Sequence, residues 1–366
     1  MKKIISIAPG RTCLFGDHQD YLGLPIIACA ISRNIKLTAI ENGLRIFNIN
    51  KPDINVKRVI NIDDEICHIE KEDHLLYALR VLKRHGCIPN KGYDIKFQGN
   101  LPINAGTSSS SAVVVSWVNF LIEAFGVNAK VTPEFISQMA YEAEVLEQGA
   151  PGGKMDQYSI GLGNIVYLET GDDFSYEIIN TPLEGLIIGE SGIPKETVGL
   201  LSELREKTWL AISRVKNEVS GFDIKDAKKE DLEKYLSYVP DSLKNYFHAA
   251  IVNHHITKRA FEEFKKESPD FIKIGALMSD HHNVLKNLLK ITVPRIDDMI
   301  EAALHTGALG AKIVGSGGGG SIVVLSPKGK EQYIINAIKN AGAKDAFQVS
   351  VDPGARIVKT SKTINV

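Results

Sequence analysis

The chain has 366 residues, of which 44% are hydrophobic and 24% are charged, and its formal net charge is −1. A nearly neutral chain offers no basic field to nucleic acid or to an anionic membrane, so we expect neither as a partner and favour a small-molecule ligand. The length exceeds what one hydrophobic core usually supports, which predicts two domains.

Targeting and redox signals are absent from the sequence. The cysteines are four widely separated residues, Cys13, Cys29, Cys67 and Cys87. They form no metal-binding pattern, so we interpret them as buried thiols of a reducing compartment. The N-terminal apolar run ends at Pro9, too early for a signal peptide, and no stretch approaches the roughly 20 apolar residues that span a bilayer. We therefore expect a cytoplasmic protein whose first strand covers residues 4–8.

Four ionisable side chains follow this strand within a loop rich in glycine. They are Arg11, Asp17, His18 and Asp20. A guanidinium, two carboxylates and an imidazole between glycines are more typical of a functional site than of a solvated surface loop. The segment is therefore predicted to be a site-forming loop.

The next elements alternate between strands, a loop and a helix. Strand-like runs occupy residues 25–30, 35–40, 44–49 and 93–97, with an acidic loop near 63–73 and a helix over 75–85. The run at 93–97 alternates apolar and polar residues, which indicates a half-buried strand. This strand leads into the most distinctive stretch of the chain, residues 101–112.

Within that stretch, five consecutive hydroxyl residues, 107–111, come directly before an apolar run over 112–125. The pattern predicts a loop and a buried helix capped by serine. Free backbone amides and the positive end of the helix dipole attract anions, phosphate among them. On its own, the stretch fits an anion site and a purely structural cap equally well.

Two further acidic residues stand beside helix and turn signals. Residues 132–134 combine an N-cap, a proline and an acid, which predicts a helix start. Glu144 falls at the edge of that helix's apolar stripe, where a carboxylate faces either a cleft or solvent. The glycine-rich run at 149–153 ends the helix and places Asp156 on or just beyond a tight loop. This run is not a P-loop, because methionine follows Lys154 where that motif requires Ser or Thr.

The second half of the chain is mostly helical and then returns to strands. We expect strands at 164–168 and 186–189 with a hairpin or linker between them, helices over 198–305, strands at 310–314 and 321–325, a helix at 329–341, and final strands at 346–351 and 355–359 that complete the second domain. Residues 315–320 have dinucleotide-fold glycine spacing, but a strand follows where that fold needs a helix. We expect a tight hairpin there, either structural or with amides against a phosphate or a neighbouring loop.

Three separated stretches resemble the motifs of the GHMP kinase family. Residues 9–21 are similar to the galactokinase signature G-R-x-x-x-x-G-E-H-x-D-Y, residues 102–112 to P-x-G-x-G-L-S-S-S-A, and residues 310–320 to the glycine-rich C-terminal motif. Residues 152–157 also match the galactokinase G-x-M-D-Q run. The motifs occur in the family's order at fitting separations, so the resemblance extends over nearly the whole chain.

The resemblance implies a two-domain α+β fold. A ribosomal-protein-S5-like N-terminal domain would cover residues 1–182, and a ferredoxin-like C-terminal domain would cover residues 183–366. The implied activity is ATP-dependent phosphorylation of a monosaccharide hydroxyl, above all the anomeric C1 hydroxyl of galactose or of a related hexose or uronic acid.

The resemblance also implies roles for individual residues. The triphosphate of ATP would lie on the serine-rich loop, formed by Asn104, Ala105, Gly106, Thr107, Ser108, Ser109, Ser110 and Ser111. Ser110 and Glu144 would be the ligands of Mg²⁺, which prefers hard oxygen donors. Asp156 would accept or orient the proton of the attacking hydroxyl, and Arg11 would stabilise charge between this carboxylate and the transferred phosphate. The sugar would contact Asp17, His18, Asp20 and Gly153.

Asp17 stands where galactokinases carry a glutamate. The aspartate side chain is one methylene shorter, so its carboxylate would lie farther from the far end of the sugar. Uronic acids and other hexoses therefore stay open as substrates, although a carboxylated sugar would need a nearby cation that the sequence does not identify. The residues of the motifs resemble those of a sugar kinase more than those of a mevalonate-type kinase. A catalytically silent sensor of sugar and ATP is disfavoured because Arg11, Glu144 and Asp156 occur together.

Overall fold

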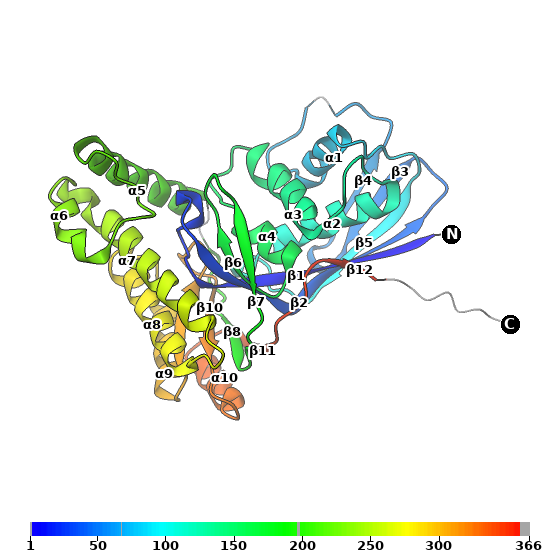
Figure 1. Ribbon diagram of the computed structural model, residues 1–366. Coiled ribbons are helices and arrows are strands. Elements are labelled where there is room, and N and C mark those ends of the chain that lie inside the picture. The colour runs from blue at the N-terminus through cyan, green and yellow to red at the C-terminus, as the bar shows by residue number, and fades with distance from the viewer. Residues whose placement is uncertain (1, 67, 196–197, 359–366) are drawn as a thin grey trace.

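A computed structural model describes residues 2–66, 68–195 and 198–358 (Figure 1). The first half contains β1 (Lys3–Phe15), β2 (Ile26–Glu41), β3 (Ile46–Lys51), β4 (Val56–Asn61), α1 (His74–Arg84), β5 (Tyr93–Gly99), α2 (Ser109–Phe125), α3 (Pro133–Tyr141), α4 (Met155–Leu162), β6 (Ile165–Glu169) and β7 (Ser175–Ile179). The second half contains β8 (Leu186–Glu190), α5 (Val198–Glu218), α6 (Leu232–Leu236), α7 (Asp241–Phe264), α8 (Phe271–Asn287), α9 (Pro294–His305), β9 (Gly310–Val314), β10 (Ser321–Leu325), α10 (Glu331–Asn340), β11 (Asp345–Val349) and β12 (Arg356–Ile357).

The larger sheet has the strand order β12-β1-β2-β5-β3-β4, and β6 and β7 continue it from the first part of β2. Helices α1 to α4 lie on one face of this sheet (Figure 1). The central helix α2 packs on β1 and β2, and its indole Trp117 is fully buried against Phe47 and Phe120. This apolar packing explains why α2 is hydrophobic on nearly all sides, as the sequence predicts.

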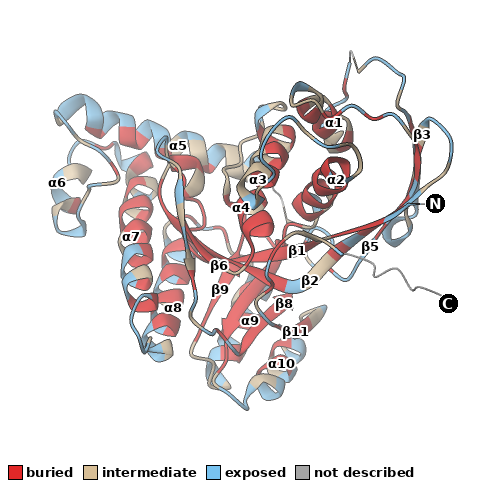
Figure 2. Cartoon of the chain, turned by 45° about the vertical axis from the view of Figure 1, so that its right-hand side comes forward, coloured by how far each residue is buried: buried red, intermediate tan, exposed pale blue. Residues whose placement is uncertain are grey.

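The smaller sheet is antiparallel throughout and has the order β11-β8-β10-β9. Numbered by their order in the sequence, these strands run 4-1-3-2 across the sheet. Helices connect β8 to β9 and β10 to β11, as in a ferredoxin-like unit. Buried residues, red in Figure 2, concentrate in both sheets and on the helix sides that face them. The predicted α+β organisation is confirmed.

Several predictions about the second half are confirmed. Helices α5 to α9 occupy the region predicted to be helical, β6 and β7 form a hairpin, and β9 and β10 flank the glycine run. The expectation that a strand at 355–359 completes the second domain is wrong, because β12 pairs with β1 in the larger sheet. Residue 359 itself lies outside the described residues. The domain boundary after residue 182 stays a prediction.

The first strand is longer than predicted. The expected loop begins at Gly16 rather than at Pro9, because β1 continues through Pro9 and Gly10 to Phe15, and a register shift after Pro9 accommodates the proline. A Cβ on Gly10 would lie 2.3 Å from Leu101 Cδ2 and 2.9 Å from the Thr107 carbonyl oxygen. Glycine therefore lets the strand approach the serine-rich loop closely, and Arg11 is a buried strand residue rather than a loop residue.

The three described cysteines, Cys13, Cys29 and Cys87, are buried and free, as predicted. Cys67 lies outside the described residues. No helix in the described part of the chain has both the length and the apolar character needed to cross a membrane.

Candidate active site

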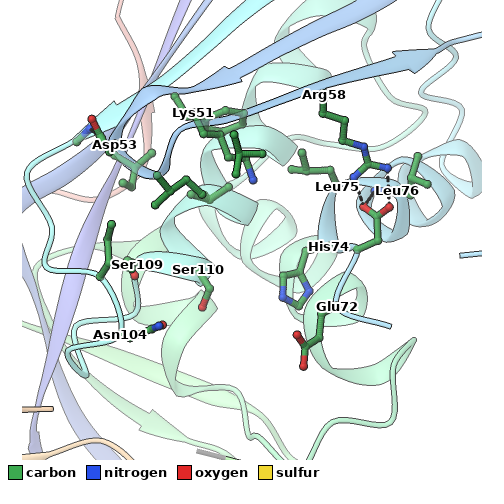
Figure 3. A pocket seen from close by; sticks show the side chains of 18 of the residues that line it. Lys51, Asp53, Arg58, Glu72, His74, Leu75, Leu76, Asn104, Ser109 and Ser110 are labelled. Atoms are coloured by element: carbon green, nitrogen blue, oxygen red, sulfur yellow. Dashed lines mark hydrogen bonds and ion pairs between the residues drawn. The ribbon is translucent and has the colours of Figure 1, made fainter. Parts of the chain in front are cut away.

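Two adjoining cavities lie at the serine-rich loop. The larger, of about 850 Å³, is bounded by the β3–β4 connection, the start of α1 and the loop itself. Figure 3 looks into it, with Ser109, Ser110 and Asn104 on one side and His74 and Glu72 on the other. The smaller, of about 460 Å³, extends from the same loop toward α4 and the second domain. The two cavities share five wall residues, Lys71, Glu72, His74, Asn104 and Ser110.

An arginine, an aspartate and a serine form a connected group at the wall of the smaller cavity. Arg11 donates to Asp156 Oδ1 from Nε at 2.8 Å and from Nη2 at 2.7 Å, and Nη1 donates to the Gly106 carbonyl oxygen. Ser108 Oγ donates to Asp156 Oδ2 at 2.7 Å. Burial raises the pKa of Asp156, but Arg11 and Ser108 outweigh it, so the net shift is downward and the carboxylate is ionised at neutral pH.

The backbone of the serine-rich loop explains how Ser108 reaches this aspartate. Asn104, Gly106 and Ser108 have positive φ angles of 55°, 84° and 57°, so the chain curls tightly before α2 begins. The predicted serine cap is wrong in one respect, because the Ser108 side chain makes no capping hydrogen bond to α2. Its hydroxyl is directed to Asp156 instead.

The eight residues of the loop divide into two groups. Those that face the cavities are Asn104, Ser109, Ser110 and Ser111. Those that are buried beneath the loop are Ala105, Gly106, Thr107 and Ser108. The Thr107 carbonyl accepts the backbone N–H of Arg11 at 3.2 Å, which fixes the loop on β1.

The glycine hairpin at 315–320 packs against this loop from the other side. A Cβ on Gly106 would lie 3.0 Å from the Val314 carbonyl oxygen, so the two backbones approach closely. On its other flank, the hairpin exchanges hydrogen bonds with the segment after β8. For example, the Gly320 N–H donates to the Ile193 carbonyl oxygen at 2.9 Å. Contact with a neighbouring loop, one of the alternatives left open by the sequence, is therefore observed, and contact of the hairpin amides with a phosphate stays a prediction.

Glu144 lies on a single turn of π-helix, Glu142–Leu146, that continues α3 and borders the smaller cavity. Such turns are frequent at functional sites because they redirect side chains out of the α-helical register. Gln157 Nε2 donates to Glu144 Oε2 at 2.7 Å. Burial raises the pKa of Glu144, while the charge of His74 and the bond from Gln157 act in the opposite direction.

Asp20, His18 and Gly153 border the same cavity. A Cβ on Gly153 would lie 2.3 Å from Asp20 Oδ2, so glycine makes room for this carboxylate. Burial and the charge of Asp156 raise the pKa of Asp20 to about 6. Burial lowers the pKa of His18 to about 4, so its ring is neutral at pH 7, with Nδ1 3.1 Å from the Tyr21 hydroxyl.

Asp17, next to His18 in the chain, is engaged in a buried ion pair with Lys312. Its Oδ2 is 2.5 Å from Lys312 Nζ, and its Oδ1 accepts the Gly315 N–H at 2.8 Å. Asp17 and Lys312 are both buried, and Asp17 is not among the residues that line either cavity. A lysine within the apolar run of β9 is an unusual feature, and this sequence signal could have identified Lys312 as a partner for a buried acid.

Lys195 also belongs to the site and was not predicted. It lies on the segment after β8 and borders the smaller cavity together with Asp156 and Glu144. Burial lowers the pKa of its ammonium, and the charge of Asp156 acts in the opposite direction. Nothing in the local sequence distinguishes this lysine from a surface lysine, because only the fold brings the segment after β8 to the cavity.

Family models match three parts of the chain. These are the galactokinase galactose-binding signature at residues 1–39, the GHMP kinases N terminal domain at 73–164 and the GHMP kinases C terminal at 260–344. Among curated proteins, the mevalonate kinase of Thermococcus sibiricus is 26% identical, with 97% of this chain and 98% of the relative covered. The galactokinase of Bacillus subtilis is 27% identical, with 96% and 94% covered.

Solved structures share the fold. Lactococcus lactis galactokinase complexed with galactose matches with a TM-score of 0.85 at 19% identity, covering 97% of this chain and 95% of that chain. Methanococcus jannaschii mevalonate kinase matches with a TM-score of 0.70 at 20% identity, covering 96% and 99%. The three family models lie in the expected order and together cover more than half of the sequence. The chain therefore belongs to the GHMP kinase family of phosphotransferases, which use ATP as the phosphate donor.

Proposed function

We propose that this chain is a sugar kinase that transfers the γ-phosphate of ATP to the anomeric C1 hydroxyl of galactose or of a related hexose or uronic acid. The observation that carries the proposal is the Arg11–Asp156–Ser108 group at the wall of a cavity that meets a second, larger cavity at the serine-rich loop. A phosphotransferase needs two binding spaces that meet where the phosphoryl group moves.

In this proposal, the nucleoside of ATP occupies the larger cavity and the sugar occupies the smaller one. The triphosphate lies at their junction on Asn104, Ser109, Ser110 and Ser111, at the N-terminal end of α2. A helix N-terminus favours anions through its free N–H groups and its dipole. The buried residues of the loop, from Ala105 to Ser108, support this surface from beneath.

Asp156 is the residue that handles the acceptor proton. The acceptor oxygen forms a bond to the γ-phosphorus, the bond between that phosphorus and the β,γ-bridging oxygen breaks, ADP leaves, and the hydroxyl proton passes to Asp156. Each carboxylate oxygen has two acceptor sites, so the bonds from Arg11 and Ser108 leave room for the substrate hydroxyl. The low pKa of Asp156 suits a loose transition state, in which the carboxylate mainly orients the nucleophile.

The donor set beside the triphosphate position fits Mg²⁺. Ser110 and Glu144 both border the smaller cavity, and within the described residues Glu144 forms no ion pair at salt-bridge distance. The described residues contain no cluster of three His, Cys, Asp or Glu that could hold a metal, but Mg²⁺ in kinases needs only one or two protein oxygens besides the phosphates. When bound, the ion neutralises charge on the phosphate oxygens.

An ADP-release assay with ATP and Mg²⁺ tests the proposal. The acceptor panel contains galactose, galacturonate, glucuronate, N-acetylhexosamines and mevalonate. Turnover with a hexose or uronic acid that yields the 1-phosphate supports it. Turnover confined to mevalonate would replace it with the activity named for the Thermococcus sibiricus relative. Saturable sugar binding without turnover on any acceptor would instead identify a silent sensor.

A further inference from the structure

The charges at the wall of the smaller cavity leave the transferred phosphate short of cations. Arg11 is already engaged by Asp156 and by the Gly106 carbonyl. Asp156, Glu144 and Asp20 are three carboxylates around the same space. A triphosphate brings several further negative charges, so another cation near Asp156 is needed in addition to Mg²⁺ to balance them.

Lys195 is the ammonium that lies in this position. It borders the smaller cavity with Asp156 and Glu144, and both carboxylates interact electrostatically with it. Within residues 2–66, 68–195 and 198–358, no carboxylate forms an ion pair with Lys195. Lys71 also borders the cavity, but it is exposed, whereas Lys195 is among the groups that most strongly lower the pKa of Asp156.

The segment that carries Lys195 is held in place by the glycine hairpin. Ser191 Oγ donates to the Gly320 carbonyl at 2.7 Å and accepts the Ile193 N–H at 3.1 Å. A Cβ on Gly319 would lie 2.6 Å from the Ile193 carbonyl oxygen and 2.8 Å from that of Pro194. The hairpin therefore contacts the serine-rich loop on one flank and the residues just before Lys195 on the other, and so holds the backbone that brings Lys195 to the wall of the smaller cavity.

We propose that Lys195 is a further catalytic residue, whose ammonium contacts the γ-phosphate of ATP from the second domain and stabilises the negative charge on the phosphoryl group during transfer. This inference rests on the proposed function, because it assigns the smaller cavity to the acceptor and the junction to the γ-phosphate. It makes the site dependent on both domains, with Arg11 and the serine-rich loop on one side and Lys195 on the other.

The test compares binding of a non-hydrolysable ATP analogue with binding of ADP, which lacks the γ-phosphate, in the presence of Mg²⁺. Lys195→Met should lower the affinity for the analogue about tenfold, because a charge-assisted hydrogen bond to the γ-phosphate is lost. The affinity for ADP should change less than twofold. Turnover with the best acceptor should fall about 100-fold, as when one donor to developing charge is removed. Lys195→Arg, which keeps the charge, should restore most of the analogue affinity.

Lys344→Met is the matched control. Lys344 lies beside the same segment but outside the cavity, where it pairs with Glu190 at 2.8 Å and is 65% exposed. Lys344 does not border the smaller cavity, so this variant should match the wild type in both nucleotide affinities. Equal weakening of the analogue and ADP by Lys195→Met, or no weakening, would overturn the inference, as would a loss confined to acceptor affinity. A wild-type protein that binds neither nucleotide would instead overturn the proposed function on which the inference rests.

Discussion

The Arg11–Asp156 and Lys312–Asp17 ion pairs have similar distances but different access to the smaller cavity. Arg11 Nη2 is 2.7 Å from Asp156, and Lys312 Nζ is 2.5 Å from Asp17. The Asp156 side chain is 31% exposed, whereas that of Asp17 is 1% exposed. A carboxylate that borders a cavity can accept a substrate hydroxyl, whereas one enclosed by a lysine and a backbone N–H can only hold the protein together.

The Asp17 pair joins the two domains. Asp17 follows β1, and Lys312 lies on β9, where its ammonium also donates to the Cys13 and Ile313 carbonyls. Burial raises the pKa of Asp17, but Lys312 outweighs it and lowers the pKa to about 2. The Asp17 carboxylate is therefore ionised at neutral pH. Its bonds to Lys312 and to the Gly315 N–H lead us to infer that Asp17 supports the acceptor cavity and does not bind a sugar hydroxyl.

The largest expected effect is on the Arg11–Asp156 pair, which borders the smaller cavity. Asp156→Asn should reduce turnover by about 10² to 10⁴, the range for loss of a general base, because the amide cannot take the hydroxyl proton. ATP-analogue affinity should change little, since Asp156 lies on the acceptor side of the junction. Steady-state turnover and analogue titration measure the two quantities. Near wild-type turnover would show that Asp156 is not the proton acceptor.

Loss of the buried Lys312–Asp17 pair should affect stability instead of turnover. Lys312→Met leaves Asp17 buried without its cation, and we expect the free energy of unfolding to fall by about 3–5 kcal/mol. The double variant Asp17→Asn, Lys312→Met should recover a large part of this loss, because no buried charge remains. Urea unfolding of the two single variants and the double variant gives the coupling energy. Additive losses would contradict an energetic coupling between Asp17 and Lys312.

These pairs also show what the sequence could predict. The motifs identified Arg11 and Asp156 as candidates, but the sequence placed Arg11 in a loop because Pro9 and Gly10 resemble a turn. Pairing with β2 and close contact with Thr107 instead extend the strand through both residues. Lys195 follows β8 and Lys312 lies on β9, two strands of the smaller sheet, and their proximity to residues of the larger sheet depends on long-range contacts that no local pattern encodes.

Glu144 extends the comparison to a carboxylate that forms no ion pair at salt-bridge distance within the described residues. If it binds Mg²⁺, Glu144→Gln should raise the Mg²⁺ concentration for half-maximal turnover about tenfold, since loss of a carboxylate ligand removes a charged hard donor. Titration of turnover with Mg²⁺ at fixed ATP measures this shift. Glu142→Gln, on the same turn but outside the cavity walls, is the control and should behave as wild type. An unchanged Mg²⁺ requirement in Glu144→Gln would remove Glu144 from the metal site.

Asp20 provides the smallest expected effect, through pH. Its pKa is raised to about 6, so the carboxylate gains a proton as the pH falls below 6 and loses its capacity to accept a bond from a sugar hydroxyl at that oxygen. We therefore expect kcat/KM for the acceptor to be flat above pH 7 and to fall toward tenfold per unit well below pH 6. The pKa of Asp156 is shifted downward and that of His18 is about 4, so neither should titrate in this range.

Asp20→Asn separates this titration from that of Glu144, whose pKa is also raised. The variant should have a lower kcat/KM at pH 8 and a nearly flat profile from pH 5.5 to 8, because the group that titrates has been removed. A slope that persists in Asp20→Asn but disappears in Glu144→Gln would assign the titration to the proposed metal ligand. The charge state of the smaller cavity would then be set on its phosphate side rather than on its sugar side.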